Sequence, residues 1–347
     1  MTIPFSDLYA GAVQPLAVDV QDSACDHDLP MPPAFERSVH HWSQAEIDAL
    51  RLAMASRRPL LVRGEPGTGK TQLARAAAEA LGWHLHVVAI HPRTEAPDLV
   101  ARFDAVRRLA DAQAQRLDCG DDDPKYWIPG PLWWAFDWAD AARFKGIEHA
   151  RAPSGHVLLI DEIDKADSDL PNSLLELLGQ RRLHIPALRR SIGNGHLTPL
   201  VIVTTNEERE LPAAFVRRCM VLNLGVPQGM DYVDWLAQRG QAHHGAGTDK
   251  PLDDGVLRMA ADQLVKDRAA VEAASLPPPG PAEYLDLLAA LYELTKDKPP
   301  TDRADKQREL IQQLSAYAYL KHSGDAARNQ PELAQTRTAL GGAHGKA

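Results

Sequence analysis

Residues 59–81 read PLLVRGEPGTGKTQLARAAAEAL, and they give the clearest structural signal in the chain. The apolar run at 59–62 has the length and composition of a buried strand. Residues 71–81 are rich in strong helix formers, and Gly82 follows them as a typical helix C-cap. The residues between these elements match the pattern GxxxxGK[ST]. Because a strand, a glycine-rich turn and a helix in this order aim backbone N–H groups at a phosphate, we predict a nucleotide-binding phosphate loop.

The residue types of the loop suit the phosphates of ATP and its Mg²⁺ ion. Glycines allow the tight turn, and Pro66, which has no N–H, would shape it. Lys70 would reach the β- and γ-phosphates, and the Thr71 hydroxyl would bind Mg²⁺. The expected cofactor-binding residues of this segment are Gly64, Glu65, Pro66, Gly67, Thr68, Gly69, Lys70, Thr71 and Gln72.

The alternation of strand and helix continues along the chain. Short apolar, β-branched runs stand at residues 85–90, 156–160, 200–205 and 220–224. Ser43 and Glu46 form a capping-box pattern before a helix over 45–56, and residues 98–117 have the apolar spacing of a single helix. Strands that are apolar on both faces belong to a parallel sheet with helices on either side. We therefore predict an α/β fold of the P-loop NTPase type with a five-stranded parallel sheet.

The pattern changes near residue 225 and suggests four segments. Residues 1–42 are rich in Asp and Pro and are expected to be a partly disordered extension. The α/β nucleotide-binding domain would span 43–227. Residues 228–322 are helical in pattern and predict a second, all-helical lid domain, and residues 323–347 predict a flexible tail.

Polar residues follow two of the predicted core strands. Asp161 and Glu162 come directly after the strand at 156–160, where the carboxyl end of a parallel strand would face the phosphate loop. Asp161 suits a role on Mg²⁺, and Glu162 suits the polarisation of an attacking water. Asp164 and Lys165 are more typical of a helix start and a surface. Asn206 ends the strand at 200–205 and would hold the lytic water or contact the γ-phosphate; the alternative is a buried Asn that satisfies a loop.

The order of these motifs, followed by LPAAFVRRC at 211–219, resembles the AAA+ superfamily. That resemblance implies a ring, usually a hexamer, with ATP bound between neighbouring subunits. It also implies an arginine that reaches into the neighbour's site from the end of this helix, and Arg217 and Arg218 occupy that place. The alternative is a solvated basic pair at a helix end.

Three less specific sequence segments resemble the MoxR branch of AAA+. They are TEAPDLVARF at 94–103, YWIPGPLWWAF at 126–136 and LLELLGQRRLHIP at 174–186. This resemblance implies a partner with a von Willebrand factor A domain. The chain departs from the branch in two places, because Asp164-Lys165 stands where MoxR proteins often have Asn-Arg, and Glu283 stands where a lid arginine is expected.

Four tryptophans between Trp127 and Trp138 predict a packed helix start, or alternatively a partner contact.

The composition of the chain reduces the number of functional classes that we expect. A formal charge of −9 argues against a large nucleic-acid footprint. No apolar stretch or N-terminal leader pattern predicts membrane insertion or secretion, and three separated cysteines indicate reduced thiols in the cytoplasm. We therefore expect an ATP-hydrolysing ring protein that remodels or activates a protein partner. The alternatives are a nucleic-acid motor in a defence or restriction system, and a nucleotide-gated scaffold with little hydrolysis.

Overall fold

A computed structural model of the chain gives the fold in two compact units. It describes residues 8, 11–16, 38–116, 124–147, 152–180, 183–193, 198–226, 229–273 and 275–319. The first unit comprises residues 1–64 and 69–224, and the second comprises residues 65–68 and 225–347. The predicted tail at 323–347 and most of the predicted extension at 1–42 lie outside the described residues. Within 1–42, Val13–Leu16 (β1) and Ser38–His41 (β2) pair as antiparallel strands.

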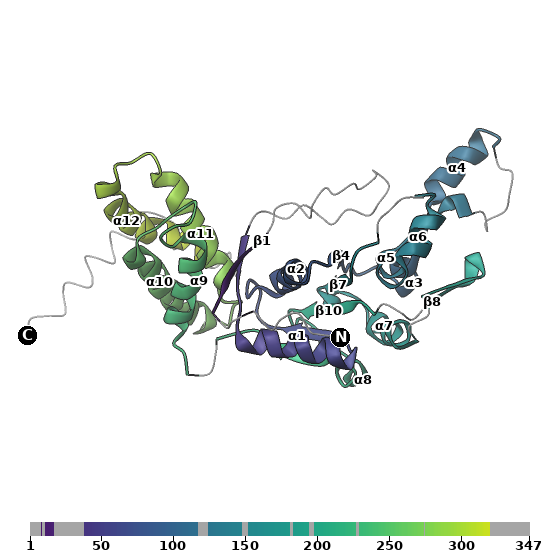
Figure 1. The fold of residues 1–347 in the computed structure, drawn as a ribbon. Helices are drawn as coiled ribbons and strands as arrows, with labels where there is room; N and C mark the ends of the chain where they lie inside the picture. The colour runs from purple at the N-terminus through teal and green to yellow at the C-terminus, as the bar shows by residue number, and fades with distance from the viewer. Residues whose placement is uncertain are drawn as a thin grey trace, which may run out of the picture. The chain divides into compact units, whose positions relative to one another are not determined.

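A five-stranded parallel sheet forms the centre of the first unit, as predicted (Figure 1). Its strands are β3 (Leu60–Arg63), β4 (His84–Ala89), β7 (His156–Asp161), β10 (Leu200–Thr205) and β11 (Met220–Asn223). They lie in the order β11-β3-β10-β7-β4, and each neighbouring pair is parallel. The chain crosses from β3 to β4 at the edge of the sheet and then returns through β7 and β10 to β11, so the carboxyl ends of β3, β10 and β7 lie next to one another.

Helices cover both faces of this sheet, because its strands are apolar on both sides. Leu60 and Val62 of β3 pack into one core with α1 (Gln44–Ser56) and α2 (Lys70–Leu81). Leu61 points to the opposite core with α5 (Pro131–Phe136), α6 (Trp138–Phe144) and α7 (Asp169–Gln180). This division follows the alternation of side chains along a strand.

Local signals at two helix ends are confirmed. Ser43 Oγ accepts from the backbone N–H of Glu46 at 3.3 Å, and Glu46 Oε2 accepts from the backbone N–H of Ser43 at 2.6 Å, so the capping box at α1 is complete. Gly82 ends α2 with a φ of 62°, a left-handed conformation that favours glycine.

The prediction of a single helix over 98–117 is wrong. The structure has α3 (Ala96–Val100), then β5 (Ala101–Phe103), then α4 (Ala105–Gln113). Strand β5 pairs antiparallel with β6 (Trp127–Pro129), so its backbone bonds go to a distant segment instead of a helix. Asp104 then caps a new helix by accepting from the backbone N–H of Arg107 at 2.9 Å.

The tryptophan-rich segment is mainly core. Trp133 and Trp134 on α5 are fully buried, and Trp138 on α6 is buried beside them. Helix α7 leads to a small hairpin of β8 (Leu183–Ile185) and β9 (Arg190–Ile192). The short helix α8 (Ala213–Val216) lies between β10 and β11 in the chain.

The second unit is built from α-helices, as the pattern after residue 228 predicts. They are α9 (Tyr232–His244), α10 (Asp254–Ala273), α11 (Pro281–Thr295) and α12 (Pro300–Tyr319). Their apolar sides share one core that includes Leu236, Leu257, Tyr284, Leu288 and Ile311. Among the residues that the structure describes, no helix is both long enough and apolar enough to cross a membrane.

Candidate functional site

Lys70 lies at the start of α2 and is almost completely buried. Its ammonium donates to the carbonyl oxygen of Gly64 at 2.7 Å, so the loop folds around the lysine. Gly69 has a φ of 98°, which only glycine adopts without strain. Burial lowers the pKa of Lys70, and nearby carboxylates, Asp161 foremost, oppose that shift. The environment of the Lys70 side chain therefore favours an ion pair with an additional negative group, such as a phosphate.

The middle of the phosphate loop, residues 65–68, belongs to the second unit. Gly67 has a φ of 80°, and a Cβ there would lie 2.5 Å from the backbone nitrogen of Ala282. Arg268 on α10 donates to both carboxylate oxygens of Glu65, at 2.6 and 2.8 Å. This hydrogen bonding raises the pKa of Arg268. Thr68 Oγ1 donates to the carbonyl of Glu65 at 2.8 Å and closes the turn.

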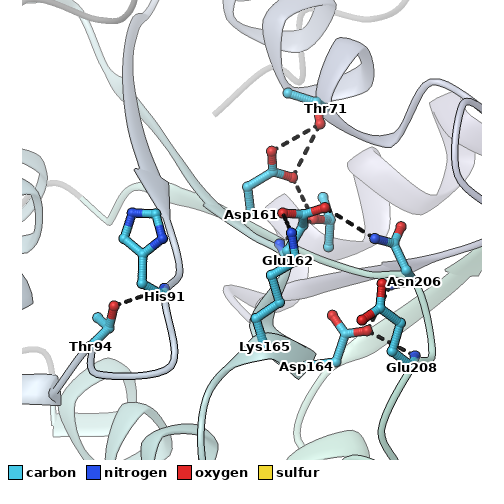
Figure 2. A network of polar contacts seen from close by, with 10 residues as sticks. Thr71, His91, Thr94, Asp161, Glu162, Asp164, Lys165, Asn206 and Glu208 are labelled. Atoms are coloured by element: carbon cyan, nitrogen blue, oxygen red, sulfur yellow. Dashed lines mark hydrogen bonds and ion pairs between the residues drawn. The ribbon is translucent and has the colours of Figure 1, made fainter.

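Thr71 and Asp161 meet where β7 ends. The Thr71 hydroxyl lies 3.1 Å from each carboxylate oxygen of Asp161 (Figure 2). Thr204 on β10 donates to Asp161 Oδ1 at 2.5 Å and fixes the carboxylate in place. A hydroxyl and a carboxylate are oxygen donors of the kind that Mg²⁺ prefers, so the pair fits a magnesium site. Gln72 follows in the first turn of α2 and is half-buried.

Glu162 and Asn206 come together at the same edge of the sheet. Asn206 Nδ2 donates to Glu162 Oε1 at 3.1 Å, and Lys165 forms an ion pair with Oε2 of the same carboxylate (Figure 2). The pairing with Glu162 raises the pKa of Lys165. Glu162 has a φ of 59°, and its backbone N–H donates to Thr204 Oγ1 at 2.9 Å. A non-glycine residue in this conformation is strained, and such strain is common where a side chain must be aimed at a site.

Asp164 and Lys165 belong to this network, although the sequence suggested a helix start and a surface. Asp164 is only 2% exposed. Its Oδ2 accepts the backbone N–H groups of Asn206 and Glu208 at 3.1 and 3.0 Å, so it shapes the loop after β10. Both residues lie in a short 3₁₀ turn, Ile163–Lys165, which directs their side chains back to the site. No local pattern marks such contacts, because their partners are more than forty residues away or depend on the turn geometry.

Arg217 and Arg218 follow α8, and both are exposed. The structure does not bring them into contact with Glu162 or Asn206. Arg58, just before β3, donates to their carbonyl oxygens at 2.7 and 3.1 Å and so fixes their main chain. Arg217 lines an open cavity of about 620 Å³ beside the loop after β10, whereas Arg218 does not line it.

The fold and this site together are similar to those of an AAA domain. Residues 59–219 match the family model described as "AAA domain (dynein-related subfamily)". A segment of the chain is 28% identical over 198 residues to midasin from Giardia intestinalis, covering 54% of this chain and 3% of that protein. The chain thus spans a small fraction of that relative's length. These findings make residues 59–219 similar to AAA domains, and they do not single out the MoxR branch.

Solved structures with a similar chain path include two of RuvB from Thermotoga maritima. A single-residue mutant of that protein is 17% identical, with a TM-score of 0.42, and the match covers 77% of this chain and 68% of that one. The structure described as the RuvB Holliday junction branch migration motor is 17% identical, with a TM-score of 0.40 and coverages of 76% and 66%.

Proposed function

We propose that this chain hydrolyses ATP as a ring-forming AAA+ protein, of the MoxR branch or close to it, and that hydrolysis remodels or activates a protein partner. The observation that carries the proposal is the position of Glu162. Its carboxylate is hydrogen-bonded to Asn206, and the preceding residue, Asp161, is hydrogen-bonded to Thr71 of the phosphate-loop helix. The candidate base, a polar side chain that suits the water and an oxygen-donor pair that suits a metal ion therefore lie at the same edge of the sheet.

Each group has one task in this proposal. Lys70 would neutralise the β- and γ-phosphates, and Thr71 and Asp161 would hold Mg²⁺. When bound, that ion supplies positive charge to the phosphate oxygens. Asn206 would orient the water, and Glu162 Oε1 or Oε2 would accept its proton as the water oxygen attacks the γ-phosphorus. The bond between this phosphorus and the bridging oxygen would break, and ADP would leave with that oxygen.

Arg218, or Arg217, would complete the site of a neighbouring subunit. Both are exposed, and Arg58 holds their main chain from the same subunit, so their side chains extend from a fixed base. An arginine supplied by a neighbour stabilises charge on the transferring phosphoryl group. Because Arg217 borders the cavity next to its own subunit's β10 loop, Arg218 is the better candidate for the neighbour's site.

The MoxR resemblance suggests a partner that carries a von Willebrand factor A domain. Two alternative functions would each be recognised by a different measurement. A nucleic-acid motor would bind DNA or RNA with a steep dependence on salt, which the net charge of −9 does not favour. A nucleotide-gated scaffold would bind ATP tightly and hydrolyse it very slowly.

The test of the base uses Glu162→Gln with Lys70→Ala as its companion. Glu162→Gln should keep ATP bound while the turnover number falls roughly 10²- to 10⁴-fold, as expected for a lost general base. Lys70→Ala should lose nucleotide binding, because the buried cation of the loop is removed. Unchanged turnover in Glu162→Gln would refute the assignment.

Light scattering with ATP and Mg²⁺ tests the ring, and a strict monomer at micromolar concentration would contradict it.

Mixing of inactive subunits tests the shared site. Arg218→Ala subunits have an intact phosphate loop, and Lys70→Ala subunits have an intact arginine. Each variant alone should turn over roughly 10³-fold more slowly or not at all. Mixed rings should regain activity, because some interfaces then join an intact loop to an intact arginine. If no mixture that contains Arg217→Ala or Arg218→Ala regains ATPase activity, neither residue is the arginine that completes the neighbour's site.

A further inference from the structure

The phosphate loop is divided between the two units along the chain. Gly64 and the residues from Gly69 onward belong to the first unit, whereas residues 65–68 belong to the second. Backbone N–H groups of residues 65–68 are among those that would face the phosphates of a bound nucleotide. The conformation of this part of the loop is therefore set by contacts within the second unit.

Arg268 on α10 holds this part of the loop through Glu65. Its Nη1 and Nη2 donate to the two carboxylate oxygens of Glu65, at 2.8 and 2.6 Å. A two-point pair of this kind fixes the orientation of the carboxylate as well as its distance. The Arg268 side chain is 16% exposed and that of Glu65 is 52% exposed, so the arginine is the more firmly held partner.

The arginine is itself held from several sides. Nη1 also donates to the Tyr232 hydroxyl at 3.3 Å and to the carbonyl oxygen of Pro279 at 3.2 Å. Nε pairs with Glu272 at 2.9 Å, one turn further along α10. The guanidinium carbon also lies 5.2 Å from the centre of the Tyr232 ring. Because these contacts come from α9, α10 and the residues before α11, Arg268 offers Glu65 a preformed anchor.

The backbone of the same loop segment also approaches the start of α11 closely. A Cβ on Gly67 would lie 2.5 Å from the backbone nitrogen of Ala282, and a Cβ on Gly280 would lie 3.2 Å from the carbonyl oxygen of Pro66. The ion pair of Glu65 and this close approach act on neighbouring residues of one short segment. Together they determine the path of residues 65–68.

We propose that Arg268 is a positioning residue for nucleotide binding, which holds residues 65–68 in the conformation that accepts the phosphates of ATP and ADP. The inference rests on the proposed role of this loop in nucleotide binding. Arg268 acts through Glu65 and is assigned no contact with a phosphate. Without the pair the loop would adopt other conformations for part of the time, and the apparent affinity would fall in proportion to the fraction that remains competent.

The experiment measures the Kd of the full chain for ADP and for a non-hydrolysable ATP analogue by calorimetry with Mg²⁺. Arg268→Met removes the guanidinium, and Arg268→Lys keeps a charge but cannot form the two-point pair. Arg258→Met is the matched control, because Arg258 is also on α10 and forms an exposed ion pair with Asp234. We expect both Kd values to rise about three- to ten-fold in Arg268→Met and by a smaller factor in Arg268→Lys. Arg258→Met should keep the parent values.

The comparison of the two nucleotides distinguishes positioning from direct contact. The loop N–H groups cradle the α- and β-phosphates, which both nucleotides carry, so the two Kd values should rise by a similar factor. A rise for the ATP analogue alone would overturn the proposal and show that Arg268 contacts the γ-phosphate. Unchanged Kd values in folded Arg268→Met and Arg268→Lys, or an equal rise in Arg258→Met, would overturn it as well.

A double variant tests whether Arg268 acts through Glu65. Glu65→Met should raise both Kd values, and the addition of Arg268→Met should raise them no further, because the two residues then share one effect. Independent, multiplying effects in the double variant would contradict this route.

Binding and turnover separate this inference from the proposed function. If the parent chain binds neither nucleotide, the proposed site fails and the positioning role fails with it. If the parent binds both and Arg268→Met binds them equally well, only the positioning role fails. If Glu162→Gln retains turnover, the assignment of the base fails, whereas raised Kd values in Arg268→Met still support the positioning role.

Discussion

Three neighbouring histidines on the sheet, two of them buried, should make the first unit sensitive to acid. His84 and His86 lie on β4, and His156 lies beside them on β7. His86 Nε2 is 3.1 Å from His156 Nδ1, and the His156 ring stacks on Trp138. His86 and His156 are almost completely buried. Burial, helped by mutual repulsion of the charged forms, lowers the pKa of His86, and burial followed by the charge of His84 lowers that of His156 to about 4.

The sign and size of the effect follow from the linkage between protonation and folding. Below about pH 6.5 an unfolded chain binds a proton at His156, whereas the native chain keeps this imidazole neutral until about pH 4. The stabilisation is therefore complete above pH 6.5 and is lost as the pH falls. Between pH 7.5 and 5.0, His156 alone should remove about 2 kcal/mol from the free energy of unfolding. Burial also lowers the pKa values of His84 and His86, so they add to the loss.

Urea unfolding at pH 7.5 and 5.0, followed by tryptophan fluorescence, measures this loss. Trp134 and Trp138 lie next to the histidines and report on the first unit. His156→Gln should have a lower free energy of unfolding than the parent at pH 7.5. Its free energy of unfolding should, however, fall by about 2 kcal/mol less than that of the parent when the pH is lowered from 7.5 to 5.0. His184→Gln, at an exposed position on β8, is the control and should behave like the parent. Equal losses in the parent and in His156→Gln would refute the reasoning.

Two further predictions concern stability. Gly130→Ala should cost about 1–3 kcal/mol in urea unfolding, because its Cβ would lie 2.4 Å from the carbonyl oxygen of Leu99 and the backbone must move. Gly179→Ala on α7, where a Cβ meets nothing within 4 Å, is its control and should not destabilise the fold. Asp164→Ala should lower the free energy of unfolding by about 2 kcal/mol, since two backbone N–H groups lose a buried charged acceptor. It should also slow ATP hydrolysis by releasing the loop that holds Asn206, and a variant with the parent's melting temperature and turnover would contradict both effects.

The sequence by itself determined the elements whose signals are local. The strand and helix around the phosphate loop, the Gly82 cap and the capping box of Ser43 and Glu46 all form where their residues predict them. The five parallel strands were also predictable, because strands that are apolar on both faces require cover on both sides. The meeting of Asp161 with Thr71 of the phosphate-loop helix follows from the same reasoning, since Asp161 stands where a parallel strand ends.

Only the tertiary structure decided the contacts that depend on the folded backbone. Residues 98–117 have helical spacing throughout, yet Ala101–Phe103 leave the helix because their backbone groups bond to Trp127–Pro129. Asp164 looks like a helix-start residue until the loop after β10 brings two N–H groups to its carboxylate. Lys165 looks like a surface lysine until a 3₁₀ turn places it on Glu162. Such pairings carry no local pattern, because each partner's residue type is common and only the folded backbone sets the distance between them.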